Sequence, residues 1–196
     1  MINNVKQIRN FLRFPTDYSF YFLEIIKRRK ENPEMENHAK LIRDYYIYSL
    51  EYFDKIVSDV IDLCEKHNAR AYFRLNRREA DKIAFLYNKR LAELLITKDF
   101  KNIPKAYPAV VGEFSNDDIR TWVIDLDYNS EGIVEYFEEI KTKINNLQPE
   151  GEKIYVELPT KNGIHLITKP FRLDQFKQTF PSVEVHKDNP TIMYQP

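Results

Sequence analysis

Two aspartates, Asp125 and Asp127, alternate with apolar residues in the stretch Thr121-Trp122-Val123-Ile124-Asp125-Leu126-Asp127. Successive side chains of a β-strand point to opposite faces, so this pattern predicts a strand with both carboxylates on one side, roughly 6.6 Å apart, and a buried opposite side. Two like charges at that distance require a cation, a shared proton or hydrogen-bond donors. A divalent metal ion would compensate the two negative charges and could also take part in catalysis. The alternative is a strand end whose acids face water or pair with lysine and arginine.

The sequence from residue 119 onward has a regular order of predicted elements. These are strands at 120–127, 153–158, 164–168 and 183–186, with helices at 131–147 and 173–180. Asn162-Gly163 is a strong hairpin signal between the two middle strands, because a type I′ turn needs positive φ at both central residues. The order β-α-β-β-α-β predicts a ferredoxin- or RRM-like core over 119–196, with both helices on one sheet face and the other face open. Residues 192–194 are predicted to add an edge strand.

The first part of the chain, 1–118, is predicted to be a mainly helical lobe. Apolar residues recur at helical spacing from Val5 to about His67, including one long amphipathic helix from Leu41 to Cys64. One strand is predicted near 69–75. Asn76 and Glu79 then resemble a capping box that opens a helix ending near Thr97. The predicted fold class is therefore α+β, with a helical lobe followed by the RRM-like core.

Composition limits the location and the partners of the protein. No apolar run approaches a membrane span, and the segment Met1 to Arg13 is too polar for a signal peptide, so we expect a cytoplasmic protein. The lone cysteine, Cys64, lies in an apolar helical pattern and is predicted to be a buried structural thiol. Lysine plus arginine balance aspartate plus glutamate at 30 against 30, which argues against broad electrostatic adhesion to nucleic acid.

Strand alternation also predicts which side chains share the open face of the core. Each predicted strand contributes an acid or a histidine to the side that carries the two aspartates, namely Glu157, His165, Glu184 and His186. Apolar residues of the same strands, such as Val156, Leu158, Leu166 and Val185, are predicted to face the helices.

A family resemblance follows from two of these motifs. The strand Val123-Ile124-Asp125-Leu126-Asp127 and the segment Thr160-Lys161-Asn162-Gly163-Ile164-His165 resemble the first two motifs of the archaeo-eukaryotic primase superfamily. Members of that superfamily have an RRM-like catalytic core and synthesise primers or extend strands from nucleoside triphosphates with two metal ions. The resemblance implies that Asp125 and Asp127 are catalytic metal ligands and that His165 contacts the phosphates of the incoming nucleotide.

The resemblance also implies a third acid, a cofactor and partners. Glu184 fits the third acidic motif best, with Asp188 as a substitute. The implied cofactor is Mg²⁺ or Mn²⁺, because two metal ions can activate the primer hydroxyl and stabilise the leaving pyrophosphate. Lys161 and Lys169 flank His165 and would neutralise triphosphate charge. The implied partners are nucleic acid, a nucleoside triphosphate and a replication protein, with no membrane.

Three functions compete on this evidence. The first is a metal-dependent nucleotidyltransferase of the primase type. The second is a metal-dependent nuclease that uses the same acids with His165 or His186 and needs no triphosphate. The third is a non-catalytic adaptor that keeps a primase-like fold and binds nucleic acid or protein without turnover.

Overall fold

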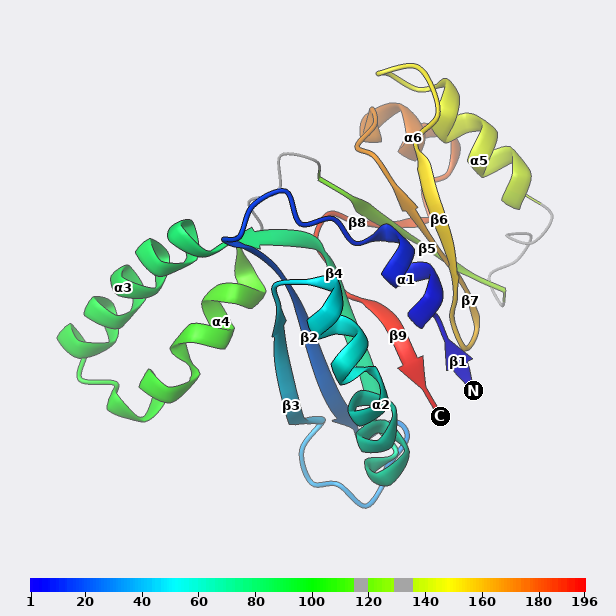
Figure 1. The fold of residues 1–196 in the computed structure, drawn as a ribbon. Helices are drawn as coiled ribbons and strands as arrows, with labels where there is room; N and C mark the ends of the chain where they lie inside the picture. Colours follow the sequence, from blue (N-terminus) through cyan, green and yellow to red (C-terminus); the bar gives the residue numbers. More distant parts are fainter. Residues whose placement is uncertain (115–119, 129–135) are drawn as a thin grey trace.

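The computed structural model describes residues 1–114, 120–128 and 136–196, and it is a mixed α+β fold with two sheets (Figure 1). The first sheet has the strand order β1-β9-β4-β2-β3. Its strands are β1 (Ile2–Asn3), β9 (Thr191–Gln195), β4 (Arg70–Glu79), β2 (Ser19–Arg28) and β3 (Ala39–Ile47). The second sheet has the order β6-β7-β5-β8. Its strands are β6 (Ile154–Pro159), β7 (Gly163–Thr168), β5 (Trp122–Asp127) and β8 (Glu184–His186). All pairings in both sheets are antiparallel, and the predicted α+β class is confirmed.

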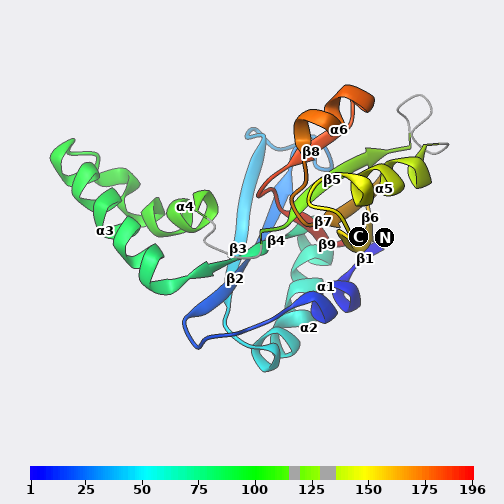
Figure 2. The ribbon, with the colours of Figure 1, turned by 90° about the horizontal axis from the view of Figure 1, so that it is seen from above.

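Helices cover both sheets. On the first sheet these are α1 (Val5–Phe11), α2 (Leu50–His67) and the ends of α3 (Ala80–Ile96) and α4 (Ala106–Glu113) nearest to the sheet. The 3₁₀ helix η1 (Phe100–Lys105) connects α3 to α4. Figures 1 and 2 show that α3 and α4 extend away from the two sheets as a helical arm. On the second sheet they are α5 (Phe137–Asn146) and α6 (Leu173–Thr179). Within the described ranges, no helix is both long and apolar enough to cross a membrane.

The prediction of a mainly helical lobe over 1–118 is wrong, because β2 and β3 occupy much of the predicted helical segment. In β2, Leu23 and Ile25 pack into the core under α2, while Phe20 and Phe22 pack against the helical arm. A strand that is buried on both faces is apolar on both, so it lacks the alternation that identifies a half-exposed strand. The predicted long helix begins only at Leu50, where the Ser49 hydroxyl caps it by accepting from the Tyr52 N–H at 3.1 Å.

The predicted capping box at Asn76 and Glu79 is also wrong. β4 continues through both residues, and α3 begins at Ala80 without a side-chain cap. Asn76 is buried, and its Oδ1 accepts from the backbone N–H of Thr121 at 2.7 Å while its Nδ2 donates to the Thr121 carbonyl at 3.0 Å. This side chain therefore joins the first sheet to the beginning of β5.

The last strand, β9, belongs to the first sheet. It lies between β1 and β4, whereas the sequence predicted an edge strand of the C-terminal core. The predicted boundary near residue 118 therefore does not separate the two sheets. One hydrophobic cluster joins them, since it contains Phe73 and Met193 from the first sheet and Val123 and Ile167 from the second.

From β5 to β8 the elements follow in the order strand, helix, strand, strand, helix, strand. Trp122, Ile124 and Leu126 face α5 and α6, which lie on the same side of the sheet in Figure 1. Residues 131–135 of the predicted helix 131–147 lie outside the described residues. The opposite face is not open along its whole length, because Val123, Ile167 and Leu158 of that face are buried in the shared core.

The hairpin between β6 and β7 is present as predicted, but its turn is not the predicted type I′ turn. The described residues with positive φ are Asn68, Lys98 and Gly151, so Asn162 and Gly163 do not form the type I′ turn. Gly163 pairs with Asp127 of β5, and a Cβ atom at position 163 would lie 1.8 Å from the Leu126 carbonyl oxygen. The glycine is thus required by the close approach of β7 to β5.

Candidate metal site

The register of the second sheet aligns polar side chains across three strands. Asp125 of β5 pairs with His165 of β7 on one side and with Glu184 of β8 on the other. Paired residues of antiparallel strands project from the same face. The sequence-predicted placement of Asp125, His165 and Glu184 on one face is confirmed, and β5 supplies the central acid.

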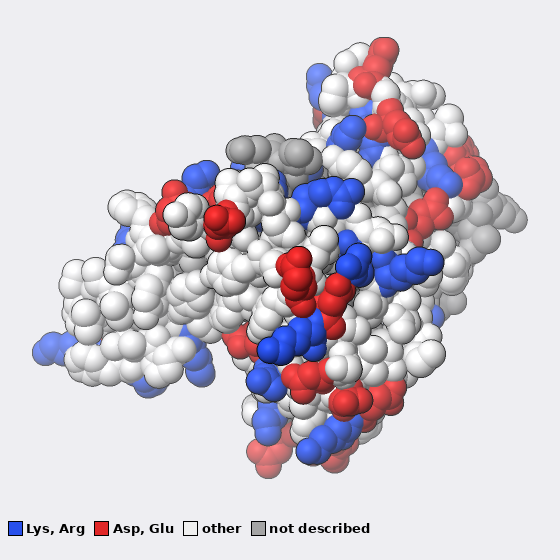
Figure 3. Space-filling view, in the orientation of Figure 1, with Lys and Arg blue, Asp and Glu red and all other residues white. Residues whose placement is uncertain are grey.

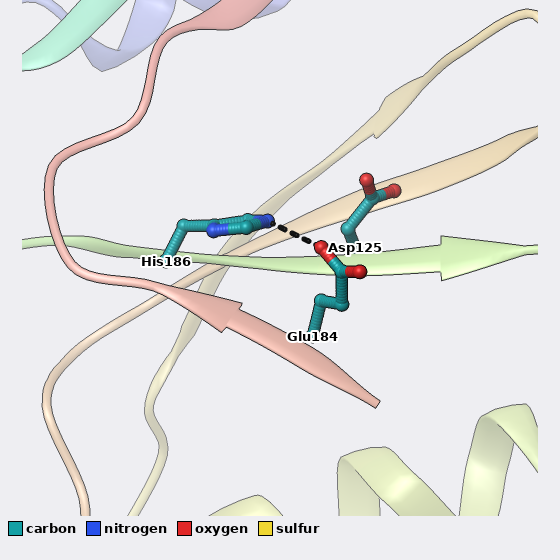
Figure 4. Close-up of side chains that lie close together, drawn as sticks. All are labelled: Asp125, Glu184 and His186. Carbon is teal, nitrogen blue, oxygen red and sulfur yellow. Dashed lines mark ion pairs between the residues drawn. The ribbon is translucent and has the colours of Figure 1, made fainter. Parts of the chain in front are cut away.

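Asp125, Glu184 and His186 form a cluster of possible metal ligands. One ligand atom from each lies within 4.8 Å of the other two. Figure 4 shows the imidazole of His186 directed toward Glu184, and Nε2 lies 3.1 Å from Glu184 Oε2. The side chain of Asp125 is 33% exposed and that of Glu184 is 70% exposed. The cluster is therefore held by the sheet on one side and accessible to solvent on the other.

His165 orients the central acid. Its Nε2 lies 3.4 Å from Asp125 Oδ1, and its Nδ1 lies 2.8 Å from the hydroxyl of the buried Thr191. With Nε2 protonated toward Asp125, Nδ1 accepts the hydrogen of the Thr191 hydroxyl. The hydrogen bond from His165 lowers the pKa of Asp125, and this effect outweighs burial, which raises the pKa. Asp125 is thus kept as the carboxylate that a metal ion requires.

Three predicted site residues lie outside the metal-ligand cluster that the described part of the chain forms: Asp127, Lys161 and Lys169. Asp127 is exposed at the end of β5, where it pairs with Gly163. Lys161 is exposed in the β6–β7 turn near that end. Lys169 follows the opposite end of β7, and its Nζ lies 5.6 Å from the centre of the Tyr155 ring. β7 has six residues and is roughly 20 Å long. Lys161 and Lys169 lie near its opposite ends, so they cannot both contact one phosphate group beside His165.

The predicted outward position of Glu157 is wrong because β6 contains a bulge. Ile154 pairs with Thr168 and Val156 pairs with Ile167, which leaves Tyr155 as an extra residue. Glu157 consequently faces α5 and pairs with Lys141 Nζ at 2.8 Å. Val156 and Leu158, which the sequence placed toward the helices, instead pack into the shared core.

Sequence reasoning missed or misjudged three residues around the site. His186 was predicted on the correct face but was not assigned as a ligand. Thr191 was not identified, because its position depends on the pairing of β9 with β4 in the other sheet. Asp188, the substitute third acid, instead accepts from the buried Arg78, whose Nη2 lies 3.0 Å from Asp188 Oδ2.

Comparisons with protein-family models, curated proteins and solved structures found no match to this chain. The chemistry and geometry of the Asp125, Glu184 and His186 cluster are therefore the basis for assigning a function.

Proposed function

We propose that this protein is a metal-dependent nucleotidyltransferase of the primase type that acts on nucleic acid with nucleoside triphosphates. The observation that carries the proposal is the Asp125, Glu184 and His186 cluster on the central and neighbouring strands of the second sheet. The element order of that sheet and its strand order β6-β7-β5-β8 support a ferredoxin- or RRM-like core, and with it the proposed resemblance to the archaeo-eukaryotic primase superfamily.

The donor set fits a divalent metal ion. Asp125 and Glu184 offer carboxylate oxygens and His186 offers an imidazole nitrogen. Carboxylates suit Mg²⁺ and Mn²⁺, whereas imidazole suits transition-metal ions, so a site with both favours Mn²⁺ over Mg²⁺. When bound, such an ion polarises a phosphoryl oxygen and lowers the pKa of an attacking hydroxyl.

Neighbouring side chains have separate proposed roles. His165, held by Thr191, orients Asp125 and keeps it ionised. Asp127 lies on the same side of β5 and is exposed, so it is the proposed carboxylate for a second ion. Of the two predicted phosphate-binding lysines, Lys161 is retained, because its turn lies at the same end of the sheet as Asp127.

One observation favours the non-catalytic adaptor as a second candidate. His165 Nε2 lies 3.4 Å from Asp125 Oδ1, so the carboxylate has a hydrogen-bond donor without a metal ion. In that case the acids contribute to stability, and the sheet is a binding scaffold.

Calorimetric titration with Mn²⁺, with and without a non-hydrolysable nucleoside triphosphate, tests the proposal. We expect Asp125→Asn and His186→Ala to weaken Mn²⁺ binding about 10-fold or more. Glu157→Gln is the matched control, since Glu157 is an acid of the same sheet that pairs with Lys141 on the opposite face. Binding that is unchanged in folded Asp125→Asn protein would refute the metal site.

Activity assays then separate the candidate functions. Primer extension that requires both Mn²⁺ and triphosphates supports the nucleotidyltransferase. Cleavage of nucleic acid without triphosphate would identify a nuclease, and absence of turnover at saturating Mn²⁺ would favour the adaptor.

A further inference from the structure

A cavity of about 620 Å³ lies between the two sheets, away from the metal cluster. Its walls come from α1 and the segment after it, from β2 and β4 of the first sheet and from β6 of the second. β6 is separated from β5 by the whole of β7, so the cavity and Asp125 do not share a strand. The volume is within the range of small-molecule sites in proteins.

Aromatic rings in fixed orientations form much of the wall. Tyr155 is the extra residue of the β6 bulge, and its ring meets Phe11 of α1 edge to face, with ring centres 5.7 Å apart. Tyr21, buried at the base, packs edge to face against Phe14 at 5.4 Å. Tyr155 remains 39% exposed, so part of this ring is accessible from the solvent side. These rings offer stacking surfaces to a flat ligand.

The cavity lining also includes basic side chains. Arg13 and Arg77 line it, and no described lining residue carries a carboxylate. The Nη1 atom of Arg13 donates to the carbonyl oxygens of Asn10 at 2.8 Å and Leu12 at 2.7 Å, which orient the guanidinium without cancelling its charge. Lys169 adds a cation beside the Tyr155 ring. In Figure 3, basic and acidic side chains are interspersed around α1 and the segment that follows it.

We propose that this cavity binds a nucleotide unit, with the base against Tyr155 and Phe11 and the phosphate near Arg13 and Lys169. Bases stack on aromatic side chains regardless of their sequence, and guanidinium groups bind phosphate through charge-assisted hydrogen bonds. The side-chain amide of Asn10, which also lines the cavity, can hydrogen-bond a base edge. The unit comes from a free mononucleotide or from single-stranded nucleic acid. Neither source requires the metal cluster, so the cavity site goes beyond the proposed function.

Calorimetric titration with AMP in the presence of EDTA tests this site without any metal ion. We expect Tyr155→Ala and Arg13→Ala each to weaken AMP binding about 10-fold, and Tyr155→Phe to preserve it, because phenylalanine keeps the ring. Tyr52→Ala is the matched control, since Tyr52 is also 39% exposed but does not line the cavity. Asp125→Asn should bind AMP as the wild type does, which separates this site from the metal site.

Titration with single-stranded oligo(dT) of eight nucleotides distinguishes the two sources. Tighter binding of the oligonucleotide than of AMP, weakened by Tyr155→Ala, supports a nucleic-acid strand in the cavity. Binding of AMP alone supports a mononucleotide. Failure of both probes to bind the wild type, or equal binding by folded Tyr155→Ala and Arg13→Ala proteins, would overturn the proposal.

Discussion

A side chain has no room at position 163, where β7 meets β5. A Cβ atom there would lie 1.8 Å from the Leu126 carbonyl oxygen and 2.9 Å from the Asp127 Cα. Both contacts are with backbone, so β5 would have to move, together with the acids that it carries. We expect Gly163→Ala to lower the free energy of unfolding by about 2–3 kcal/mol, measured by urea denaturation.

Gly112→Ala is the control for this substitution. Gly112 lies in α4, and its nearest neighbour to a new Cβ is Arg74 Nη2 at 3.7 Å, an ordinary contact. Alanine is the better helix former, so we expect no loss of stability at that position. Equal stability of the two variants would show that β5 and β7 do not approach as closely as described.

At the scale of elements, the connection between β8 and β9 holds the candidate site against the first sheet. Asp188, two residues after His186, receives hydrogen bonds from Arg78 and from Asn76 Nδ2, the latter at 2.9 Å. Arg78 also donates from Nε to the Val111 carbonyl of α4 at 2.8 Å. The arm, β4 and the end of β8 are thus joined through one guanidinium group.

We expect Asp188→Ala to destabilise the fold by about 3 kcal/mol and to weaken Mn²⁺ binding. The side chain of Arg78 is 0% exposed, so the substitution removes a carboxylate from beside a buried charge and frees the segment that positions His186. Urea denaturation measures the first effect and calorimetry the second.

Asp174→Ala provides the comparison on a surface pair. Asp174 lies 2.8 Å from Arg172, and both side chains are more than half exposed, so its loss should cost less than about 1 kcal/mol. If Asp188→Ala had an equally small effect, the ion pair between Arg78 and Asp188 would not hold the β8–β9 connection against the first sheet.

At the scale of the whole molecule, the two sheets share one core and should unfold together. Met193 of β9 is 0% exposed and belongs to the cluster that also contains Val123 and Ile167 of the second sheet. We expect Met193→Ala to cost about 3 kcal/mol through the cavity that it leaves. The fluorescence of Trp122, the single tryptophan, reports the second sheet and should show the same shifted midpoint as far-UV circular dichroism.

Two outcomes would contradict a shared core. Trp122 fluorescence could keep its wild-type midpoint while circular dichroism shifts, or the variant could show two separate transitions. Ile96→Ala serves as the control, because Ile96 is exposed at the end of α3 and its loss should change stability by less than about 0.5 kcal/mol.

Local features of the second sheet follow from short-range patterns in the amino-acid sequence. Alternation placed Asp125, Glu184 and His186 on one face, because the direction of a strand side chain depends on its position relative to its immediate neighbours. Cys64 was also correctly predicted to be a buried thiol, and burial raises its pKa to about 12.

Tertiary structure alone decided which distant segments meet. β2 was interpreted as helix because both of its faces are apolar, and only the packing of α2 and the arm explains that pattern. The Tyr155 bulge reversed the direction of Glu157, and the pairing of β9 with β4 brought Thr191 to His165. Strand partners remote in sequence are selected by the free energy of burying the whole core, which no local periodicity encodes.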